Sequence, residues 1–315
     1  MAELLTTSLA QPVAIAGSGW GRHGTWRWQD QACHWRVLGE ESHPAVLLIH
    51  GFGAASGHWR HTAAPLVAAG WCVYAIDLIG FGASDQPGLR LDNRLWARQC
   101  AGFLAQVVGR PAVLVGNSLG GLVAVTTAVV APAWVRAVAV APLPDPTLLM
   151  PIPRRRPPWR RRLRSSLAVL LCTALPLELL LPLIARTPLL DLALAAAYPN
   201  RGAIDGELRR LIARPALRPT AAWALRGMSI AMALRPRGAT AAALLERMAQ
   251  PLLVLWGRKD QLVPVAVADR LLRHKPDLEL QLLDGLGHCP HDEAPQHFNP
   301  RLLGWLESLS QSAST

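Results

Sequence analysis

The sequence is poor in cysteine and in charged residues. Its five cysteines are scattered along 315 residues and form no CxxC pair. We therefore expect neither a disulfide scaffold nor a thiolate-bound metal, and we expect a reducing compartment. Only 17% of the residues are charged, whereas 51% are hydrophobic. This composition excludes a disordered chain, and it leaves enough apolar side chains for a large core and for a greasy surface or lipid-facing element.

Several motifs are also missing. The chain has no P-loop, no HExxH and no dinucleotide-binding glycine motif in a strand–turn–helix setting, so we expect no cofactor and no metal. The N-terminus carries Glu3 and lacks the basic start of a secretory signal, so we do not expect secretion. The apolar stretch 165–185 is about long enough to cross a membrane. Because Pro176, Glu178 and Pro182 interrupt it, we do not expect a true span.

The positive charge lies mostly in one segment. The net charge is +11, and residues 150–250 alone hold 17 arginines against five acidic residues, a net of +12. Such asymmetry indicates an anionic partner. We favour a membrane surface over nucleic acid, because no recognised nucleic-acid-binding module accompanies the arginines; a solvated basic loop is the alternative. Seven of the arginines form one cluster: Arg154, Arg155, Arg156, Arg160, Arg161, Arg162 and Arg164.

Short apolar runs alternate with helical patterns along most of the chain. Such alternation is typical of an α/β fold whose mostly parallel sheet is buried on both faces. A helix with Asp92 as its N-cap is predicted over 92–108. The predicted strands are a tryptophan-rich hairpin at 25–28 and 33–39, and buried runs at 45–50, 72–77, 112–117, 135–142, 251–257 and 278–284.

The strand pattern breaks between Pro144 and Gln250, where helical segments rich in leucine and alanine are punctuated by proline. We interpret this stretch as a helical insertion that carries the positive charge. The predicted parts are an N-terminal extension (1–25), the first part of an α/β core (26–144), an arginine-rich helical cap (145–250), the second part of the core (251–309) and a tail (310–315).

One pentapeptide points to a nucleophile. Residues 116–120 read G-N-S-L-G and match G-x-S-x-G between a predicted strand and a predicted helix. Small neighbours permit the unfavourable backbone angle of such a serine, and the helix N-terminus adds partial positive charge where an oxyanion forms. Ser118 is therefore the candidate nucleophile. The backbone N–H groups of Leu119 and of Phe52, in the H-G-F-G loop at 50–53, are the candidate oxyanion donors.

A base and an acid follow in the expected order. Asp260 comes just after one predicted strand, and His288 comes just after the next. His288 is expected to deprotonate Ser118 and later to activate water, while Asp260 holds the imidazole tautomer. Two alternatives stay open: Asp145, after the sixth predicted strand, as the acid, and His291 as the base.

The other acidic residues and histidines near these motifs have structural interpretations. Asp77 and Asp85 flank a glycine turn and are expected to hold loop backbone, and His50 is expected to brace the H-G-F-G loop. Asp284 and Asp292 are expected to be turn and capping residues.

With these motifs in place, the chain resembles the α/β-hydrolase-fold enzymes over about residues 26–309. This resemblance implies a mostly parallel eight-stranded sheet flanked by helices, with a helical cap inserted after strand 6. More narrowly, the chain is similar to the pheophytinase and chlorophyll dephytylase branch of plants and cyanobacteria. The segments that carry the narrower match are the tryptophan-rich start, HGFGAASGHWR (50–60), GNSLGG (116–121), APLPDP (141–146) and GHCPHDEAP (287–295).

The narrower resemblance implies hydrolysis of the phytyl ester of chlorophyll or pheophytin at thylakoid membranes. The short N-terminus has no plastid transit peptide, which fits a bacterial protein. We expect a cytoplasmic or peripherally membrane-associated protein, on the thylakoid if the source is cyanobacterial. In this hypothesis the 154–164 arginine cluster contacts an anionic membrane, and the apolar stretch after it forms the mouth of a tunnel to Ser118.

The function expected from these observations is that of a serine hydrolase that cleaves a carboxylic ester of a large lipophilic substrate through an acyl-enzyme on Ser118. A serine nucleophile argues against the carboxylate attack of dehalogenases and epoxide hydrolases. The alternatives are a lipase, a thioesterase or a carbon–carbon-bond hydrolase with the same triad, or a non-catalytic lipid- or pigment-binding protein of the same fold.

Overall fold

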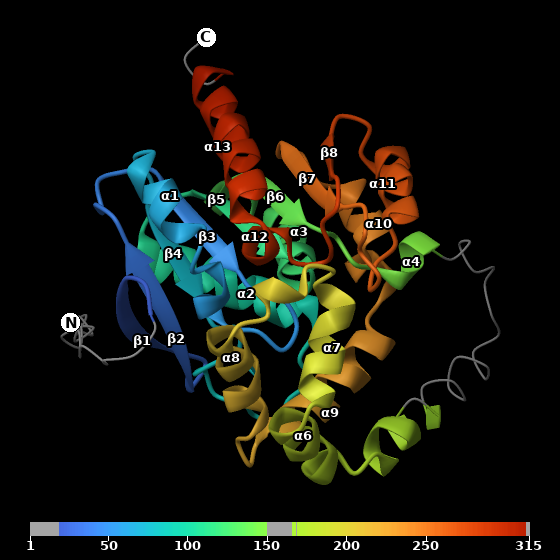
Figure 1. Cartoon of the computed structure of the whole chain (residues 1–315). Coiled ribbons are helices and arrows are strands. Elements are labelled where there is room, and N and C mark those ends of the chain that lie inside the picture. The colour runs from blue at the N-terminus through green and yellow to red at the C-terminus, as the bar shows by residue number, and fades with distance from the viewer. Residues whose placement is uncertain (1–18, 150–165, 168, 313–315) are drawn as a thin grey trace, which may run out of the picture.

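The centre of the molecule is an eight-stranded sheet (Figure 1). The computed structural model describes residues 19–149, 166–167 and 169–312. The strands follow the order β1-β2-β4-β3-β5-β6-β7-β8; β1 and β2 are antiparallel to their neighbours and the others are parallel. This confirms the predicted mostly parallel sheet. The strands are β1 Arg22–Trp28, β2 Gln31–Leu38, β3 Ala45–Ile49, β4 Cys72–Ile76, β5 Ala112–Asn117, β6 Val135–Ala141, β7 Leu252–Gly257 and β8 Glu279–Leu283.

Helices cover both faces of the sheet, which is why the central strands read as continuous apolar runs. Every residue of β3, β4, β5 and β7 is buried. On one face lie α2 (Asn93–Phe103), α3 (Leu119–Val130), α10 (Ala241–Leu245) and α11 (Ala268–His274). On the other lie α1 (Ala63–Ala68), α12 (Pro290–Glu293) and α13 (Pro295–Ser312). Short helical turns complete the core: η1 Ser56–Trp59, η2 Leu104–Val108, η3 Pro132–Trp134, α4 Pro146–Leu149, η5 Arg237–Ala239 and η6 Val265–Val267.

The predicted start of α2 is confirmed by its capping geometry. The side chain of Asp92 accepts hydrogen bonds from the backbone N–H groups of Arg94 and Leu95, at 3.0 and 3.2 Å. These bonds satisfy two of the N–H groups that a helix leaves free at its N-terminus. The following turn, η2, ends at Gly109, which adopts a left-handed conformation with φ 72°.

A helical cap lies over the carboxyl ends of the parallel strands (Figure 1). We call α6 (Leu177–Arg186), α7 (Leu189–Ala197), α8 (Gly206–Ala216) and α9 (Ala221–Leu234), with the turn η4 (Arg201–Ala203), the cap. Its helices contact one another, and α8 also contacts η1 of the core. The cap therefore stands over the loops that follow the strands, where ligands bind in folds of this kind.

Three predicted boundaries differ from the structure. Helix α10 packs against α3 in the main core, so the cap ends near Leu234 rather than at residue 250. Strand β1 begins at Arg22 and α13 continues to Ser312, so residues 22–25 and 310–312 belong to the core. Apolar patterning does not mark these ends, because β1 and the end of α13 are partly exposed. The 154–164 arginine cluster lies outside the described residues.

The apolar stretch expected not to form a span is a series of short helices over the residues that the structure describes. Within those residues, no single helix is long and apolar enough to cross a membrane. Helices α6 and α7 reach the length and apolar composition of a span only when they are taken together, and the chain bends by 81° between them. An earlier helical stretch, residues 169–174, ends just before Pro176, where a helix is disfavoured.

Candidate active site

Ser118 lies at a sharp turn between β5 and α3. Its backbone has φ 52° and ψ −117°, a strained conformation for a residue with a side chain. The glycines beside it are needed because the backbones pack closely. A Cβ at Gly116 would lie 2.3 Å from the carbonyl oxygen of Gly120, and one at Gly120 would lie 2.2 Å from that of Ile49. The turn expected from the pentapeptide is present, and it directs Ser118 towards His288.

The structure brings Ser118, His288 and Asp260 into one hydrogen-bonded chain. Nε2 of His288 lies 2.8 Å from Oγ of Ser118, and Nδ1 lies 2.9 Å from Oδ2 of Asp260. The other carboxylate oxygen accepts the N–H groups of Leu262 and Val263, at 2.9 and 2.8 Å. All three side chains are buried. With Nδ1–H donated to Asp260, Nε2 is free to accept the hydroxyl proton, as a general base must.

The two open alternatives are placed elsewhere. Both oxygens of Asp145 are occupied: one by the N–H and hydroxyl of Thr147, the other by Arg235 and the N–H of Ala241, each at 2.7–2.8 Å. Asp145 therefore anchors the end of the cap, and the acid beside His288 is Asp260. His291 is fully buried, packs on Trp59 and lies 3.4 Å from Nδ1 of His58.

The loop at 50–53 lies directly against the turn at Ser118. A Cβ on Gly51 would sit 2.6 Å from the Asn117 side chain and 3.4 Å from Cβ of Ser118. Within the described ranges, neither the N–H of Phe52 nor that of Leu119 donates a hydrogen bond. Two free backbone donors beside a serine are the arrangement that an oxyanion requires.

The predicted structural roles of His50, Asp77 and Asp85 are confirmed. His50 donates from Nδ1 to the carbonyl oxygen of Gly51 at 2.7 Å and accepts the N–H of Leu78 at 3.0 Å. Burial lowers its pKa, so the ring stays neutral. Asp77 accepts the N–H groups of two loops, and Asp85 accepts that of Ala32. The turn residue Asp284 forms an exposed ion pair with Arg258.

Sequence reasoning missed the contacts that join the cap to the loop of His288. The N–H of His288 donates to the carbonyl oxygen of Ala197 at 2.9 Å. Glu293 accepts the N–H of Asn200 at 2.8 Å and that of Gly287 at 2.6 Å. The sequence shows that Glu293 follows His288 by five residues but does not indicate its hydrogen-bond partners. Asn117 adds a further tie by donating to the carbonyl oxygen of His288 at 3.1 Å.

A buried polar chain runs beside these contacts and corrects the expectation for Asp292. His291 donates to His58, which donates to the Tyr198 hydroxyl at 2.7 Å, and Tyr198 donates to Asp292 at 3.1 Å. Arg60 also donates to Asp292 at 2.9 Å. Asp292 is thus a buried acceptor that links cap and core, rather than the turn or capping residue expected. Burial lowers the pKa of His58 to about 4 and the pKa of His291 well below its ordinary value, so both imidazoles are neutral near pH 7.

An apolar cavity of about 370 Å³ lies between the cap and the core loops at 52–53 and 80–86. Among the described residues that line it, Gln86 is the only one whose side chain carries a polar group. Phe52, one of the two candidate oxyanion donors, is part of the lining. The lining residues are Phe52, Gly53, Gly80, Phe81, Gln86, Leu181, Ile184, Ala185, Leu190, Ala193, Ile212, Ala213, Pro215, Ala216, Ala221, Leu225 and Met228.

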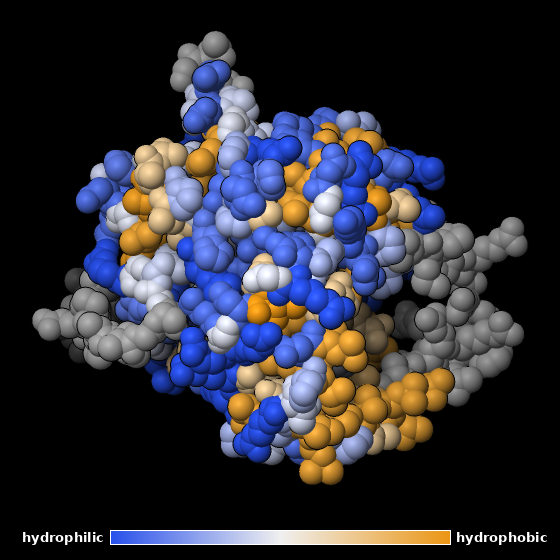
Figure 2. All heavy atoms as spheres, in the orientation of Figure 1, coloured by the Kyte–Doolittle hydropathy of each residue, from blue (hydrophilic) through white to orange (hydrophobic). Residues whose placement is uncertain are grey.

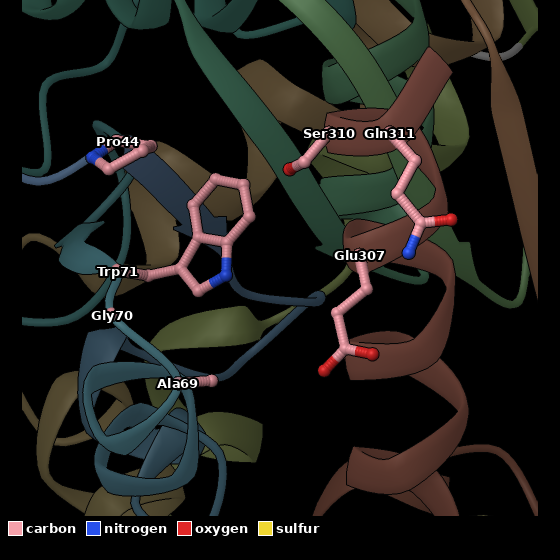
Figure 3. Close-up of a pocket in the computed structure, with 7 residues that line it drawn as sticks. All are labelled: Pro44, Ala69, Gly70, Trp71, Glu307, Ser310 and Gln311. Carbon is pink, nitrogen blue, oxygen red and sulfur yellow. The ribbon is translucent and has the colours of Figure 1, made fainter. Parts of the chain in front are cut away.

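A second cavity, of about 360 Å³, lies between Trp71 and α13, where Glu307 and Gln311 approach from the helix (Figure 3). Trp71 and Pro44 immediately precede β4 and β3, so this cavity is at the amino ends of the parallel strands, opposite Ser118. It is not part of the candidate site. Within the residues that the structure describes, no group of three His, Cys, Asp or Glu side chains is arranged to hold a metal.

Comparison with known proteins identifies the family. Residues 46–299 match the sequence pattern of the alpha/beta hydrolase family. The chain belongs to this family. The hydrolase is 27% identical to the AB hydrolase superfamily protein YfhM of Bacillus subtilis, over 87% of this chain and 94% of that protein. It is 30% identical to a pimeloyl-[acyl-carrier protein] methyl ester esterase of Vibrio parahaemolyticus, over 82% of this chain and 94% of that protein.

The narrower branch is represented by chloroplastic pheophytinase of Arabidopsis thaliana, at 25% identity over 84% of this chain. The hydrolase spans 62% of the length of that relative, and this identity and coverage do not assign it to the branch. Among solved structures, a membrane phospholipase A superposes with a TM-score of 0.72 over 91% of this chain and 86% of that one, at 24% identity. This likeness supports the fold.

Proposed function

We propose that this alpha/beta hydrolase cleaves a carboxylic ester of a lipophilic substrate through an acyl-enzyme on Ser118. The observation that carries the proposal is the chain Ser118–His288–Asp260. It lies beside the loop at 50–53, whose Phe52 lines an apolar cavity. A serine that is held strained at a helix N-terminus and bonded to an oriented imidazole is the arrangement of an activated nucleophile.

The chemistry follows from this geometry. Oγ of Ser118 attacks the ester carbonyl while Nε2 of His288 takes the hydroxyl proton, and the carbonyl electrons move to oxygen. The N–H groups of Phe52 and Leu119 stabilise that oxyanion; one such donor typically contributes about 3 kcal/mol. Collapse breaks the ester C–O bond, and the departing alcohol receives the proton from His288. Water, deprotonated by His288, then releases the acid and restores the Ser118 hydroxyl.

The cavity supports a lipophilic substrate over a charged one. Its lining carries no lysine or arginine among the described residues, and an anion without a partner is costly to bury. The relatives include a 2-hydroxy-6-oxononadienedioate hydrolase of Burkholderia vietnamiensis, 28% identical over 83% of this chain. A carbon–carbon-bond hydrolase is therefore the second candidate, but a dioate requires cationic partners that this cavity lacks.

Within lipophilic esters, the phytyl ester of chlorophyll or pheophytin is the specific candidate. The pheophytinase relative supports it, and so does the cavity volume, which lies near the lower end of ligand pockets at about 300–1,000 Å³. Such a cavity suits one hydrocarbon chain, with the bulky ring system left outside. Phytol has about 20 carbons, and at ~0.8 kcal/mol per buried CH₂ it stays in a lipid phase.

The decisive test compares wild type with Ser118→Ala on chlorophyll a, pheophytin a and p-nitrophenyl esters. Loss of the serine is expected to lower turnover by about 10⁶-fold, and only the wild type should react with a fluorophosphonate probe. Cleavage of p-nitrophenyl esters without pigment cleavage would retain the ester-hydrolase proposal and remove the phytyl one. Absence of both probe labelling and ester cleavage in wild type would favour a binding protein.

We further propose peripheral contact of the 154–164 arginine cluster with an anionic membrane. Each basic residue near an anionic leaflet contributes about 1 kcal/mol. Deleting residues 154–164 should weaken binding to vesicles that contain phosphatidylglycerol, and unchanged binding would contradict the contact.

A further inference from the structure

Helix α6 exposes apolar side chains that its packing leaves uncovered. None of its ten residues is buried, although seven of them are leucine, isoleucine or alanine. The exposed fraction is 73% for Leu179 and 69% for Leu192 on α7. Figure 2 shows hydrophobic atoms gathered over the lower part of the molecule, where Figure 1 places α6. We call the following set the leucine face: Leu170, Leu171, Leu175, Leu179, Leu183 and Leu192.

The same helix forms a wall of the apolar cavity. Leu181, Ile184 and Ala185 line the cavity, whereas Leu179 and Leu183 are exposed. The spacings of three and four residues place each set on its own side of the helix. Ile184 lines the cavity and is also 36% exposed. Only the thickness of α6 therefore separates the cavity from the leucine face.

Helix α6 is fastened by polar contacts at its first turn. Arg226 of α9 donates to Glu178 at 2.7 Å and to the carbonyl oxygen of Leu175 at 2.9 Å. This anchor fixes the orientation of the helix without covering its leucines. Contiguous exposed apolar surface of this kind marks an interaction site in most proteins.

The charge of the cap indicates which kind of partner covers the leucine face. The cap, residues 177–234, holds seven arginines and four acidic residues, a net of +3. A second copy docked on this face would bring two like-charged surfaces together, which disfavours association. A bilayer with anionic headgroups offers the opposite charge to the arginines and hydrocarbon to the leucines. Helices α6 and α7 together also have the length and composition of a membrane-embedded segment.

We propose that the leucine face inserts into the surface of an anionic lipid bilayer, and that the cavity behind α6 is loaded from that bilayer. The loading step rests on the proposed hydrolysis of a lipophilic ester. The docking step does not, because it needs only the exposed leucines and the surrounding charge. The two steps can therefore fail separately.

The test uses the full chain with Ser118→Ala as background, so that binding is measured without turnover. Vesicles contain phosphatidylcholine alone or with phosphatidylglycerol. The double variant Leu179→Ser/Leu192→Ser removes apolar contact, and its matched control is Leu89→Ser/Val130→Ser, at residues that are exposed by 48% and 49% outside the leucine face. All four residues are exposed, and thermal unfolding checks that each variant folds.

Docking predicts that the Leu179/Leu192 variant binds both kinds of vesicle at least tenfold more weakly, while the control binds like the background protein. It also predicts binding to mixed vesicles that survives 0.5 M salt. Equal binding of the two variants, or complete loss of binding in salt, would overturn the proposal. So would a wild-type dimer in sedimentation that the Leu179/Leu192 variant dissociates.

Loading is tested with Ser118 restored. The Leu179/Leu192 variant should cleave soluble p-nitrophenyl butyrate at the wild-type rate and a vesicle-embedded long-chain ester at least tenfold more slowly. Equal rates on the embedded ester would overturn loading from the bilayer. If wild type cleaves neither ester, the proposed hydrolysis fails, while the vesicle-binding result still decides docking.

Discussion

The backbone N–H of His288 donates a hydrogen bond of 2.9 Å to the carbonyl oxygen of Ala197, the last residue of α7. The cap helix that lines the cavity is thereby tied to the loop of the candidate base. Glu293 reinforces the tie, because its two oxygens accept N–H groups from Asn200 on the cap side and Gly287 on the loop side. Cap position and imidazole orientation are therefore coupled.

Glu293→Gln should slow ester hydrolysis by about tenfold or more. An amide has one acceptor oxygen, so the N–H of either Asn200 or Gly287 loses its partner at a typical cost of about 1–3 kcal/mol. The loop of His288 then loses its fixed geometry. Turnover should fall more than KM changes, and Glu307→Gln on the exposed side of α13 is the control. Equal turnover of both variants would refute the coupling.

Substitution of the two aspartates separates the acid from the structural residue. Asp260→Asn should lower turnover by about 10⁴-fold, because the imidazole loses its tautomer control. Asp145→Asn should retain far more activity but unfold more easily. Arg235, which is 9% exposed, would lose its charged partner, and breaking a buried pair costs roughly 3–5 kcal/mol. Turnover and urea unfolding of both variants measure the two effects, and an inactive but fully stable Asp145→Asn would contradict this assignment.

Stability should fall as the pH drops from about 6.5 to about 4. Burial lowers the pKa of His58 to about 4, whereas an unfolded histidine binds its proton near pH 6.5. In that window only the unfolded chain is protonated, so acid favours unfolding, by up to about 3 kcal/mol from this one group. His23, whose pKa burial also lowers to about 4, acts in the same direction.

His58→Gln should therefore flatten part of the pH dependence of the free energy of unfolding. The glutamine amide can still donate to Tyr198, but it does not titrate. The exposed His297→Gln is the control and should keep the wild-type slope. Urea unfolding at pH 7 and pH 4.5 measures both, and an unchanged slope in His58→Gln would contradict the role assigned to burial.

Filling the cavity should shorten the acyl or alcohol chain that the enzyme accepts. Ala213 of α8 lines the cavity, so Ala213→Phe removes space that a long hydrocarbon chain would occupy. Each methylene that no longer fits costs about 1–3 kcal/mol in discrimination between long and short substrates. The kcat/KM for p-nitrophenyl laurate should therefore fall about tenfold or more, while that for p-nitrophenyl acetate should not change. Ala105→Phe, on the exposed side of η2, is the control. A uniform loss over all chain lengths would point to misfolding instead.

The strands, the turn at Ser118 and the order of Ser118, Asp260 and His288 were readable from the sequence, because each depends on local chemistry. Continuous apolar runs form buried strands, and a serine between small residues after such a run permits the strained turn. In a parallel sheet the loops after the strands meet at one edge, so the three side chains were expected to come together.

Other assignments depended on contacts that only the tertiary structure could supply. Asp145 and Asp260 both follow strands, and the choice between them was made by Arg235 and Ala241, which arrive from the far end of the cap. The sequence favours a turn or capping role for Asp292, whereas packing places Tyr198 and Arg60 against its carboxylate. The groups that bond to a carboxylate come from distant segments of the chain. Which groups are packed against the carboxylate decides whether it stabilises the fold or orients the candidate base.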